Sequence, residues 1–116
     1  MIVAELVLDE AGLLKSCSIE GHAGAGSLGD DVVCAAVSIL ARTALRTLSQ
    51  AEGVAVSAEA PERGVFGFVL EKAPPGDAFS IGVTAFLAEG LSSVSRDYPT
   101  NCSVRVRTER RQHNGN

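Results

Sequence analysis

The order in which two hydrophobic spacings follow one another along the chain limits its fold more than any single motif does. Pairs of segments with a two-residue period, typical of half-buried strands, are each followed by a long segment with helical three- and four-residue spacing. A last alternating segment ends the pattern. The order ββαββαβ predicts an α/β (α+β) fold, a two-layer sandwich in which a mixed sheet carries two helices on one face. The expected strands are 2–9, 13–21, 54–59, 65–71 and 102–106, and the expected helices are 31–51 and 78–98.

Capping residues mark the starts of the two helices. Asp30 and Asp31 are expected to cap the first helix, and Asp77, after two prolines and a glycine, is expected to cap the second. The last residues of the chain are polar and have no apolar periodicity. We therefore expect one domain over residues 1–116, with a frayed tail at 108–116.

Composition and charge exclude several classes of protein. With 116 residues, 46% of them hydrophobic and 21% charged, the chain has the make-up of a folded globular domain. Ten basic against fourteen acidic residues give a net charge of −4, so no dedicated nucleic-acid binding is expected. A basic C-terminal end, which could contact RNA, is interpreted as a solvated strand edge and tail. Its arginines are Arg105, Arg107, Arg110 and Arg111.

The start of the sequence and its longest apolar runs argue against export and against a membrane partner. The first ten residues have no basic region and contain Glu5 and Asp9, which does not fit a secretory signal. No uninterrupted apolar run approaches the roughly 18 residues of a membrane span. We expect a cytoplasmic protein.

The cysteines and glycines do not form a recognisable metal or phosphate site. Three cysteines without CxxC spacing fit neither a secreted disulfide framework nor a zinc knuckle. The glycine-rich segment at 21–29 lacks the Lys-Ser/Thr ending of a phosphate-binding loop. A zinc site would need unpatterned ligands to converge, so we expect no metal and no cofactor. Those ligands would be Cys17, His22, Cys34, Cys102 and His113.

The glycine-rich segment joins a histidine to a cysteine twelve positions later, His22 and Cys34. With the helix starting at Asp31, Cys34 falls in its first turn, where free N–H groups and the helix dipole stabilise a thiolate and an oxyanion. His22 is expected to end a strand, and a flexible loop allows its imidazole to meet the sulfur as general base. The spacing predicts a Cys–His dyad. The glycines that predict a mobile loop are Gly21, Gly24, Gly26 and Gly29.

Each of these residues also has an ordinary structural interpretation. Taken alone, a cysteine near a helix start is more often a small core residue, and a strand-end histidine is usually structural. Asp31 and Ser38 share a helical stripe with Cys34, yet Asp31 fits a helix cap and Ser38 fits a hydrogen bond to a backbone carbonyl. Residue spacing alone leaves both interpretations open.

Several of these residues belong to longer motifs. They are Gly21-His22-Ala23-Gly24, then Gly29, Asp31 and Val33-Cys34-Ala35-Ala36-Val37-Ser38, and later Asp97-Tyr98-Pro99. Together these motifs resemble those of the ribosomal-processing cysteine protease (Prp) family. The resemblance implies a cytoplasmic, homodimeric cysteine endopeptidase with Cys34 as nucleophile and His22 as general base and acid. It also implies supporting roles for Asp31 and Ser38, and a substrate-gating flap over 24–29.

The resemblance further implies a substrate. It is the precursor of a bacterial large-subunit ribosomal protein, the twenty-seventh in large-subunit numbering, whose short N-terminal extension is removed after an aromatic residue. Two alternatives from other classes stay open. One is a non-catalytic, ribosome-associated binding module, and the other is a thiol acyltransferase or hydrolase of small molecules, which would need a closed apolar pocket near Cys34.

Overall fold

A computed structural model describes residues 1–21, 28–60 and 64–110 of the chain, with only the backbone described at 28–31. It contains five strands and two helices in the order ββαββαβ, as the sequence predicts. The strands pair in the order β3-β4-β2-β1-β5. The elements are β1 (Ile2–Leu8), β2 (Leu14–Glu20), α1 (Leu28–Ser49), β3 (Ala55–Glu59), β4 (Val65–Lys72), α2 (Ala78–Asp97) and β5 (Cys102–Thr108).

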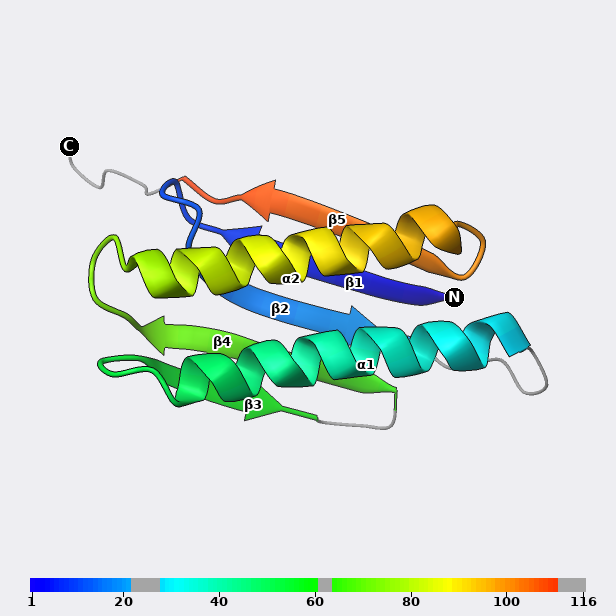
Figure 1. Cartoon of the computed structure of the whole chain (residues 1–116), viewed down its shortest axis with the longest axis horizontal. Helices are drawn as coiled ribbons and strands as arrows, with labels where there is room; N and C mark the ends of the chain where they lie inside the picture. The colour runs from blue at the N-terminus through cyan, green and yellow to red at the C-terminus, as the bar shows by residue number, and fades with distance from the viewer. Residues whose placement is uncertain (22–27, 61–63, 111–116) are drawn as a thin grey trace.

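The sheet is mixed, because one of its four strand pairs is parallel. β1 runs antiparallel to β2 and parallel to β5, so the first and last strands of the chain lie side by side. β4 is antiparallel to both β2 and β3. This arrangement brings the start of β1, the end of β2, the start of β4 and the start of α1 to one end of the molecule (Figure 1).

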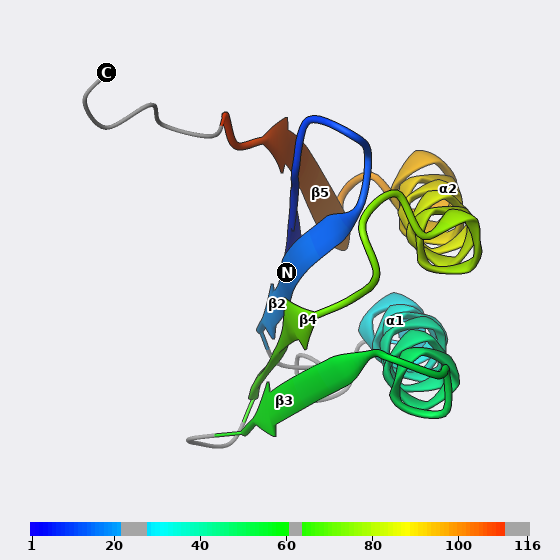
Figure 2. The ribbon, with the colours of Figure 1, turned by 90° about the vertical axis from the view of Figure 1, so that its left-hand side faces the viewer.

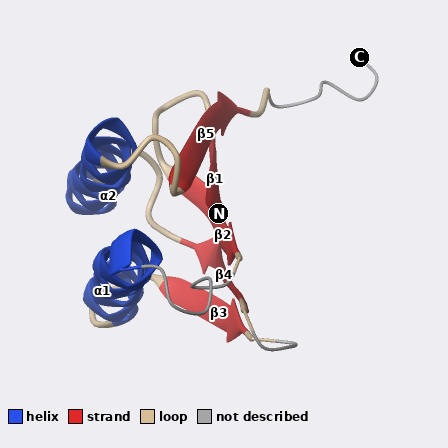
Figure 3. Cartoon of the chain, turned by 90° about the vertical axis from the view of Figure 1, so that its right-hand side faces the viewer, coloured by secondary structure: helices blue, strands red, loops and turns tan. Residues whose placement is uncertain are grey.

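Both helices lie on one face of the sheet, and the other face is open (Figures 2 and 3). The alternation in β1 explains this, because Ile2, Ala4 and Leu6 are buried toward the helices. The helices run side by side and pack closely. A Cβ added to Gly90 of α2 would lie only 2.9 Å from Leu40 of α1. The predicted two-layer α/β sandwich is thus confirmed.

Two polar side chains inside the core were not expected from the hydrophobic pattern of α2. Ser80 and Thr84 are buried at the helix–sheet interface. The Thr84 hydroxyl accepts a hydrogen bond from the Leu14 amide at 3.1 Å and donates one to the Ser80 carbonyl at 2.8 Å. Asp77 caps α2 as predicted, with its carboxylate accepting from the Ser80 amide. These contacts join the start of α2 to the start of β2.

The first helix begins earlier than predicted. It starts at Leu28 instead of Asp31 and ends at Ser49 instead of Ala51. Asp30 and Asp31 therefore lie within its first turn and are not its caps. Carboxylates are favoured at a helix cap and also throughout the first turn, so acidic residues alone do not fix where a helix begins.

The last strand is longer than predicted. β5 continues to Thr108, and the Glu109 amide donates to the Leu8 carbonyl at 2.8 Å. The reason is that β5 pairs in register with the whole of β1, from Ile2 to Leu8. The expected frayed tail therefore does not include 108 and 109, and residues 111–116 lie outside the described part of the chain.

Both helices are long and apolar enough to cross a membrane by length and composition alone. The windows Val32–Ser49 and Ala78–Asp97 have mean hydropathies of 1.5 and 1.3. The search for an uninterrupted apolar run was therefore too strict a criterion for a possible membrane span. A helix with a few scattered polar residues can still have a high mean hydropathy. Core helices of soluble proteins pass the same test, and both of these helices pack on the sheet. Only 28% and 22% of the two windows is buried, so much apolar surface faces outward.

Candidate active site

The three cysteines are unpaired, and only one of them is accessible. Cys17 and Cys102 are each 1% exposed, whereas Cys34 is half-buried. Burial raises the pKa of Cys17 to about 12, and burial also raises the pKa of Cys102. Both of these sulfurs therefore stay protonated and shielded at neutral pH. This leaves Cys34 as the accessible candidate nucleophile among the cysteines.

Cys34 does not lie where the sequence placed it within the helix. Because α1 begins at Leu28, Cys34 is the seventh helical residue and belongs to the second turn. Only the first few amides of a helix lack an intrahelical acceptor, and the dipole effect fades beyond the first turn. The expectation of free helix N–H groups around Cys34, ready to hold an oxyanion, is therefore wrong.

A pocket of about 150 Å³ opens beside Cys34. Ser38, one helical turn further along α1, lines the same pocket, so the structure brings together this predicted pair. The opposite walls come from the sheet and are mostly apolar. Besides Cys34 and Ser38, the lining residues are Ile2, Ile19, Gly21, Val37, Gly64, Val65 and Phe66.

Close backbone contacts at Gly21 hold the wall of the pocket opposite Cys34. The Gly21 amide donates a hydrogen bond to the Gly64 carbonyl at 3.0 Å. Gly21 has a φ of +130°, and an added Cβ would lie only 2.3 Å from the Met1 carbonyl oxygen. Only glycine fits this close approach without a shift of the backbone. Gly21 is thus held in place between strand ends. The expectation that it belongs to a mobile loop is wrong.

Several predicted site residues lie outside the described part of the chain. These are His22, Gly24 and Gly26, and the side chain of Asp31. Gly29 belongs to the first turn of α1, so the segment between β2 and α1 is shorter than the predicted loop. His22 directly follows Gly21, which lines the same pocket as Cys34.

Sequence analysis missed the part of the site that β4 supplies. Gly64, Val65 and Phe66 line the pocket, although they are more than twenty-five residues away from Cys34 in the chain. Their position follows from the pairing of β4 with β2, in which Phe66 lies opposite Ile19. Hairpin periodicity predicts that β4 exists but not which strand it joins, so no sequence signal marked these residues. Among the described residues, no group of three or more His, Cys, Asp or Glu side chains could hold a metal ion.

The arrangement suits acyl-transfer chemistry. A half-buried thiol at the edge of a small pocket can attack the backbone carbonyl group of a residue whose side chain occupies that pocket. The chain enters the pocket wall through Gly21 and continues directly into a histidine. An attacking thiol of this kind also needs a general base within hydrogen-bond reach.

Comparison with known proteins gives one family and several similar structures. The sequence model of the family described as cysteine protease Prp matches residues 1–103. A Streptococcus mutans protein, SMU.848, is 25% identical with a TM-score of 0.80, over 94% of this chain and 96% of that one. No curated protein matches the sequence.

Two further similar structures come from Staphylococcus aureus. Both are of an essential ribosomal processing protease Prp, one in complex with a covalently linked product peptide and one with a substrate peptide. Their identities are 17% and 16% and their TM-scores 0.73 and 0.76, over 91% of this chain and 99% of those chains. At this level of identity, the similarity establishes the common fold.

Proposed function

This chain belongs to the family of the cysteine protease Prp, and on that premise we propose that it processes a ribosomal protein. The proposed reaction removes the short N-terminal extension from the precursor of a large-subunit ribosomal protein, the twenty-seventh in large-subunit numbering. The observation that carries the proposal is the pocket in which the accessible cysteine faces the strand end that leads into His22. Two further observations support the proposal. The family motifs are present at both His22 and Cys34, and the similar S. aureus structures are those of a ribosomal processing protease.

In the proposed mechanism, Cys34 is the nucleophile and His22 the general base. The Cys34 sulfur attacks the carbonyl carbon of the scissile bond while His22 takes the thiol proton. The tetrahedral intermediate then collapses, the C–N bond breaks, and His22 returns the proton to the leaving amine. Water hydrolyses the resulting thioester, with His22 as base, and releases the carboxylate product and the free thiol.

The remaining residues of the proposed site support the dyad. Ser38 lines the pocket next to Cys34, where its hydroxyl can orient the substrate backbone. Asp31 lies one turn before Cys34 on α1, and we assign it a supporting role through the family motif. The segment that contains Gly24 and Gly26 is proposed to act as the substrate-gating flap. Glycine allows such a flap to change conformation at low steric cost.

The apolar walls of the pocket fit an apolar side chain next to the scissile bond. Ile19, Val65 and Phe66 face Cys34 across a volume of about 150 Å³. This is consistent with cleavage after an aromatic residue, which the family resemblance implies. We further propose that the protein acts in the cytoplasm, where ribosomal precursors are made, and that it is a homodimer.

The test is cleavage of a synthetic peptide that spans the extension of the ribosomal protein encoded in the same genome. Mass spectrometry is expected to find a single cut after an aromatic residue. A matched peptide with that aromatic residue replaced by aspartate should stay intact. An intact parent peptide after long incubation, or a genome whose ribosomal protein has no extension, would contradict the proposed substrate.

A further inference from the structure

A row of neighbouring residues closes the sheet at the end beside Cys34. Ile2 of β1 pairs with Cys102 of β5. On the other side of Ile2 lies Gly21, whose amide donates to the Gly64 carbonyl at 3.0 Å. Ile2 and both glycines line the Cys34 pocket. Because glycine has no side chain, the position of Ile2 determines how much room a substrate side chain has along this wall.

The row ends at the edge of the sheet, because β5 is an edge strand. In a parallel pair, alternate residues direct their backbone groups to the partner strand, and here the Ile2 amide donates to the carbonyl of Asn101. The backbone groups of Cys102 therefore point away from β1. On an edge strand, such groups have no strand to pair with.

The end of α2 supplies partners for both backbone groups of Cys102. The Cys102 amide donates to the Tyr98 carbonyl at 3.0 Å, and its carbonyl accepts from the Ser95 hydroxyl at 3.0 Å. Ser95 is half-buried and belongs to the last turn of α2, which lies beside the starts of β1 and β5 (Figure 1). At this one position, the helix end takes the place of a neighbouring strand.

The motif Asp97-Tyr98-Pro99 explains why α2 ends at this point. Proline disfavours the helical conformation for the residue before it, and Tyr98 has a φ of −131° and a ψ of 62°. The Tyr98 amide still donates to the Val94 carbonyl at 2.8 Å. Its own carbonyl accepts from the amides of Asn101 and Cys102, each at 3.0 Å. The motif therefore leaves the helix end bonded to the first residue of β5.

We propose that Ser95 is a positioning residue for the proteolysis, acting through Cys102 on the Ile2 wall of the pocket. This rests on the proposed function and adds a residue to it. The Ser95 hydroxyl fixes Cys102, and the pairing of β5 with β1 passes that position to Ile2. Ile2 then limits the room for the side chain next to the scissile bond. A wall that is supported from behind keeps its shape before the substrate arrives, and selectivity depends on such support.

The effect of losing this support is a change in selectivity. The net contribution of a neutral hydrogen bond corresponds to about 3- to 10-fold in an equilibrium constant. A domain of ordinary stability that loses one such bond stays almost fully folded. A ratio of two rates measured on one sample does not depend on the folded fraction. The selectivity for side-chain size therefore reports on the wall and not on stability.

Two affinity labels with side chains of different size measure this selectivity without the ribosomal substrate. They are chloromethyl ketones derived from phenylalanine and from alanine, which react when the Cys34 sulfur displaces chloride. Peptide mass mapping of the full chain gives the second-order rate of Cys34 labelling by each. The wild type is expected to favour the phenylalanine label, because its ring can enter the pocket.

Two variants of equal shape separate the hydrogen bond from packing. Ser95→Val removes the hydroxyl and should lower the ratio of phenylalanine to alanine labelling about 3- to 10-fold. Ser95→Thr keeps a hydroxyl and should retain the wild-type ratio. Ser95→Ala replaces the valine variant if that variant does not fold, because alanine suits a helix. The matched control is Ser93→Ala on the same helix, where the hydroxyl accepts from the exposed Arg96 side chain, and it should leave the ratio unchanged.

A double-mutant cycle tests whether Ser95 acts through Ile2. Ile2→Val shortens the wall itself, so the phenylalanine ring loses contact and the ratio should fall. Combined with Ser95→Val, the two effects should be far from additive, because both change the same wall. The effects of Ile2→Val and Ser93→Ala should add.

Four outcomes would overturn the proposal. They are a wild-type ratio near one, an unchanged ratio in Ser95→Val or its alanine replacement, equal losses in Ser95→Val and Ser95→Thr, and additive effects of Ile2→Val and Ser95→Val. Peptide cleavage by the same samples separates this proposal from the proposed function. The expected label ratios together with an intact ribosomal peptide contradict only the proposed substrate. Normal cleavage with an unchanged ratio in Ser95→Val contradicts only the role of Ser95.

Discussion

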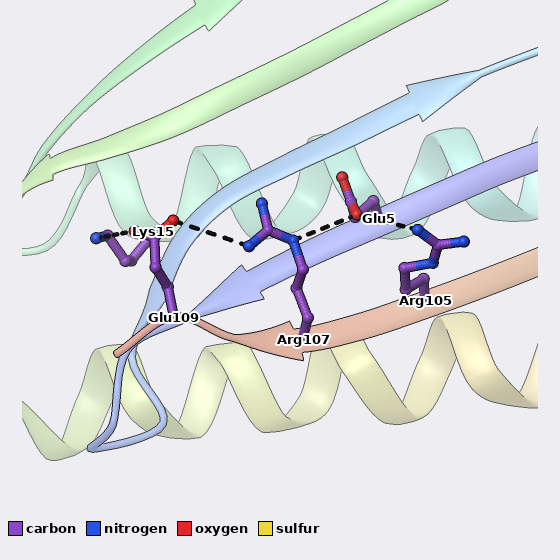
Figure 4. A network of polar contacts seen from close by, with 5 residues as sticks. All are labelled: Glu5, Lys15, Arg105, Arg107 and Glu109. Carbon is purple, nitrogen blue, oxygen red and sulfur yellow. Dashed lines mark hydrogen bonds and ion pairs between the residues drawn. The ribbon is translucent and has the colours of Figure 1, made fainter. Parts of the chain in front are cut away.

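The two ends of the five-stranded sheet carry pockets that differ in volume and in charge. At one end, the pocket beside Cys34 is small, about 150 Å³, and has no charged residue among its lining residues. At the other end, a pocket of about 430 Å³ is lined by carboxylates and lysines, and Lys15 and Glu109 at its rim form an ion pair (Figure 4). The larger and more charged pocket has no cysteine among its lining residues. The difference teaches that an accessible reactive atom identifies the candidate active site, whereas pocket size and charge density do not.

The strongest way to break this comparison is to remove the accessible sulfur. Cys34→Ala is expected to lower kcat for peptide cleavage by more than about 10³-fold, because no other group can form the thioester. The fold should persist, since the side chain is half-buried and alanine suits a helix. The matched control is Cys102→Ala, which changes a buried cysteine and should keep its activity. Cleavage retained by Cys34→Ala would end the nucleophile assignment.

Removing the proposed base should have the next largest effect. His22→Ala is expected to lower kcat/KM by about 10²- to 10⁴-fold, the usual contribution of a general base. The chain has one other histidine, His113, near its C-terminus, and His113→Ala serves as the control. Steady-state kinetics with the same peptide measures both. Equal activity of the two variants would show that His22 is structural.

The order of alkylation sharpens the contrast between the exposed thiol and the core thiols. With a pKa of about 12, Cys17 is ionised to only about one part in 10⁴ at pH 8. Cys102 is also buried with a raised pKa, so limited iodoacetamide treatment should label Cys34 at least about 100-fold faster than either. Peptide mass mapping over time gives the order. Early labelling of Cys17 or Cys102 would mean that the core opens before the site reacts.

The effect of Gly21, beside the candidate active site, on stability can be compared with that of Gly76, at the other end of the sheet. Gly21→Ala should destabilise the fold by about 1–3 kcal/mol, because φ is +130° and the new Cβ would lie 2.3 Å from the Met1 carbonyl oxygen. Gly76 also has a positive φ, +64°, but nothing lies within 4 Å of an added Cβ. Gly76→Ala should therefore cost less. Urea denaturation measures both, and equal costs would show that the contact with Met1 adds no strain.

The ion pair at the far end should have the smallest effect. The hydrogen bond and charge of Lys15 hold the pKa of Glu109 below its usual range. A lowered pKa adds stability above the pKa of the unfolded state, near 4.5, and this stability is lost as pH falls through the folded value. Because the pair is exposed, Glu109→Gln should shift the urea midpoint only slightly at pH 7, and the shift should become smaller as the pH falls below 4.5. Glu52→Gln is the control. A large shift of the urea midpoint in Glu109→Gln would mean that the Lys15–Glu109 ion pair stabilises the end of β5 substantially.

Most of the fold followed from local patterns. The alternation in β1, the Asp77 cap and the apolar stripe of α2 predicted the elements and their order, because each depends on residues close together in the chain. The start of α1 was missed because acidic residues suit both a cap and a first turn. Strand order could not be predicted either, because it depends on pairing between strands that are far apart in the chain, such as β1 with β5.

The candidate site also has a part that local sequence patterns predict and a part that depends on strand pairing. Cys34 and Ser38 were predicted to share a helix face, and they line one pocket. The wall from Gly64 to Phe66 depends on the pairing of β4 with β2, which no local pattern encodes. The fixed position of Gly21 depends on a contact with Met1, which precedes the start of β1 and is twenty residues away in the chain. Local chemistry could therefore be predicted, whereas the enclosure around it could not.

The parallel pairing of β1 with β5 has a consequence for when the enzyme becomes active. Ile2 pairs with Cys102, a separation of 100 residues, and the Ile2 amide is held by the Asn101 carbonyl. During synthesis, one edge of β1 therefore stays unpaired after β1 has left the ribosome. That edge can pair only when β5, near the end of the described chain, has been synthesised. Contacts between such distant segments form late and slow the folding of a domain. Ile2 is also a wall of the Cys34 pocket, so that wall is completed only after translation has reached β5.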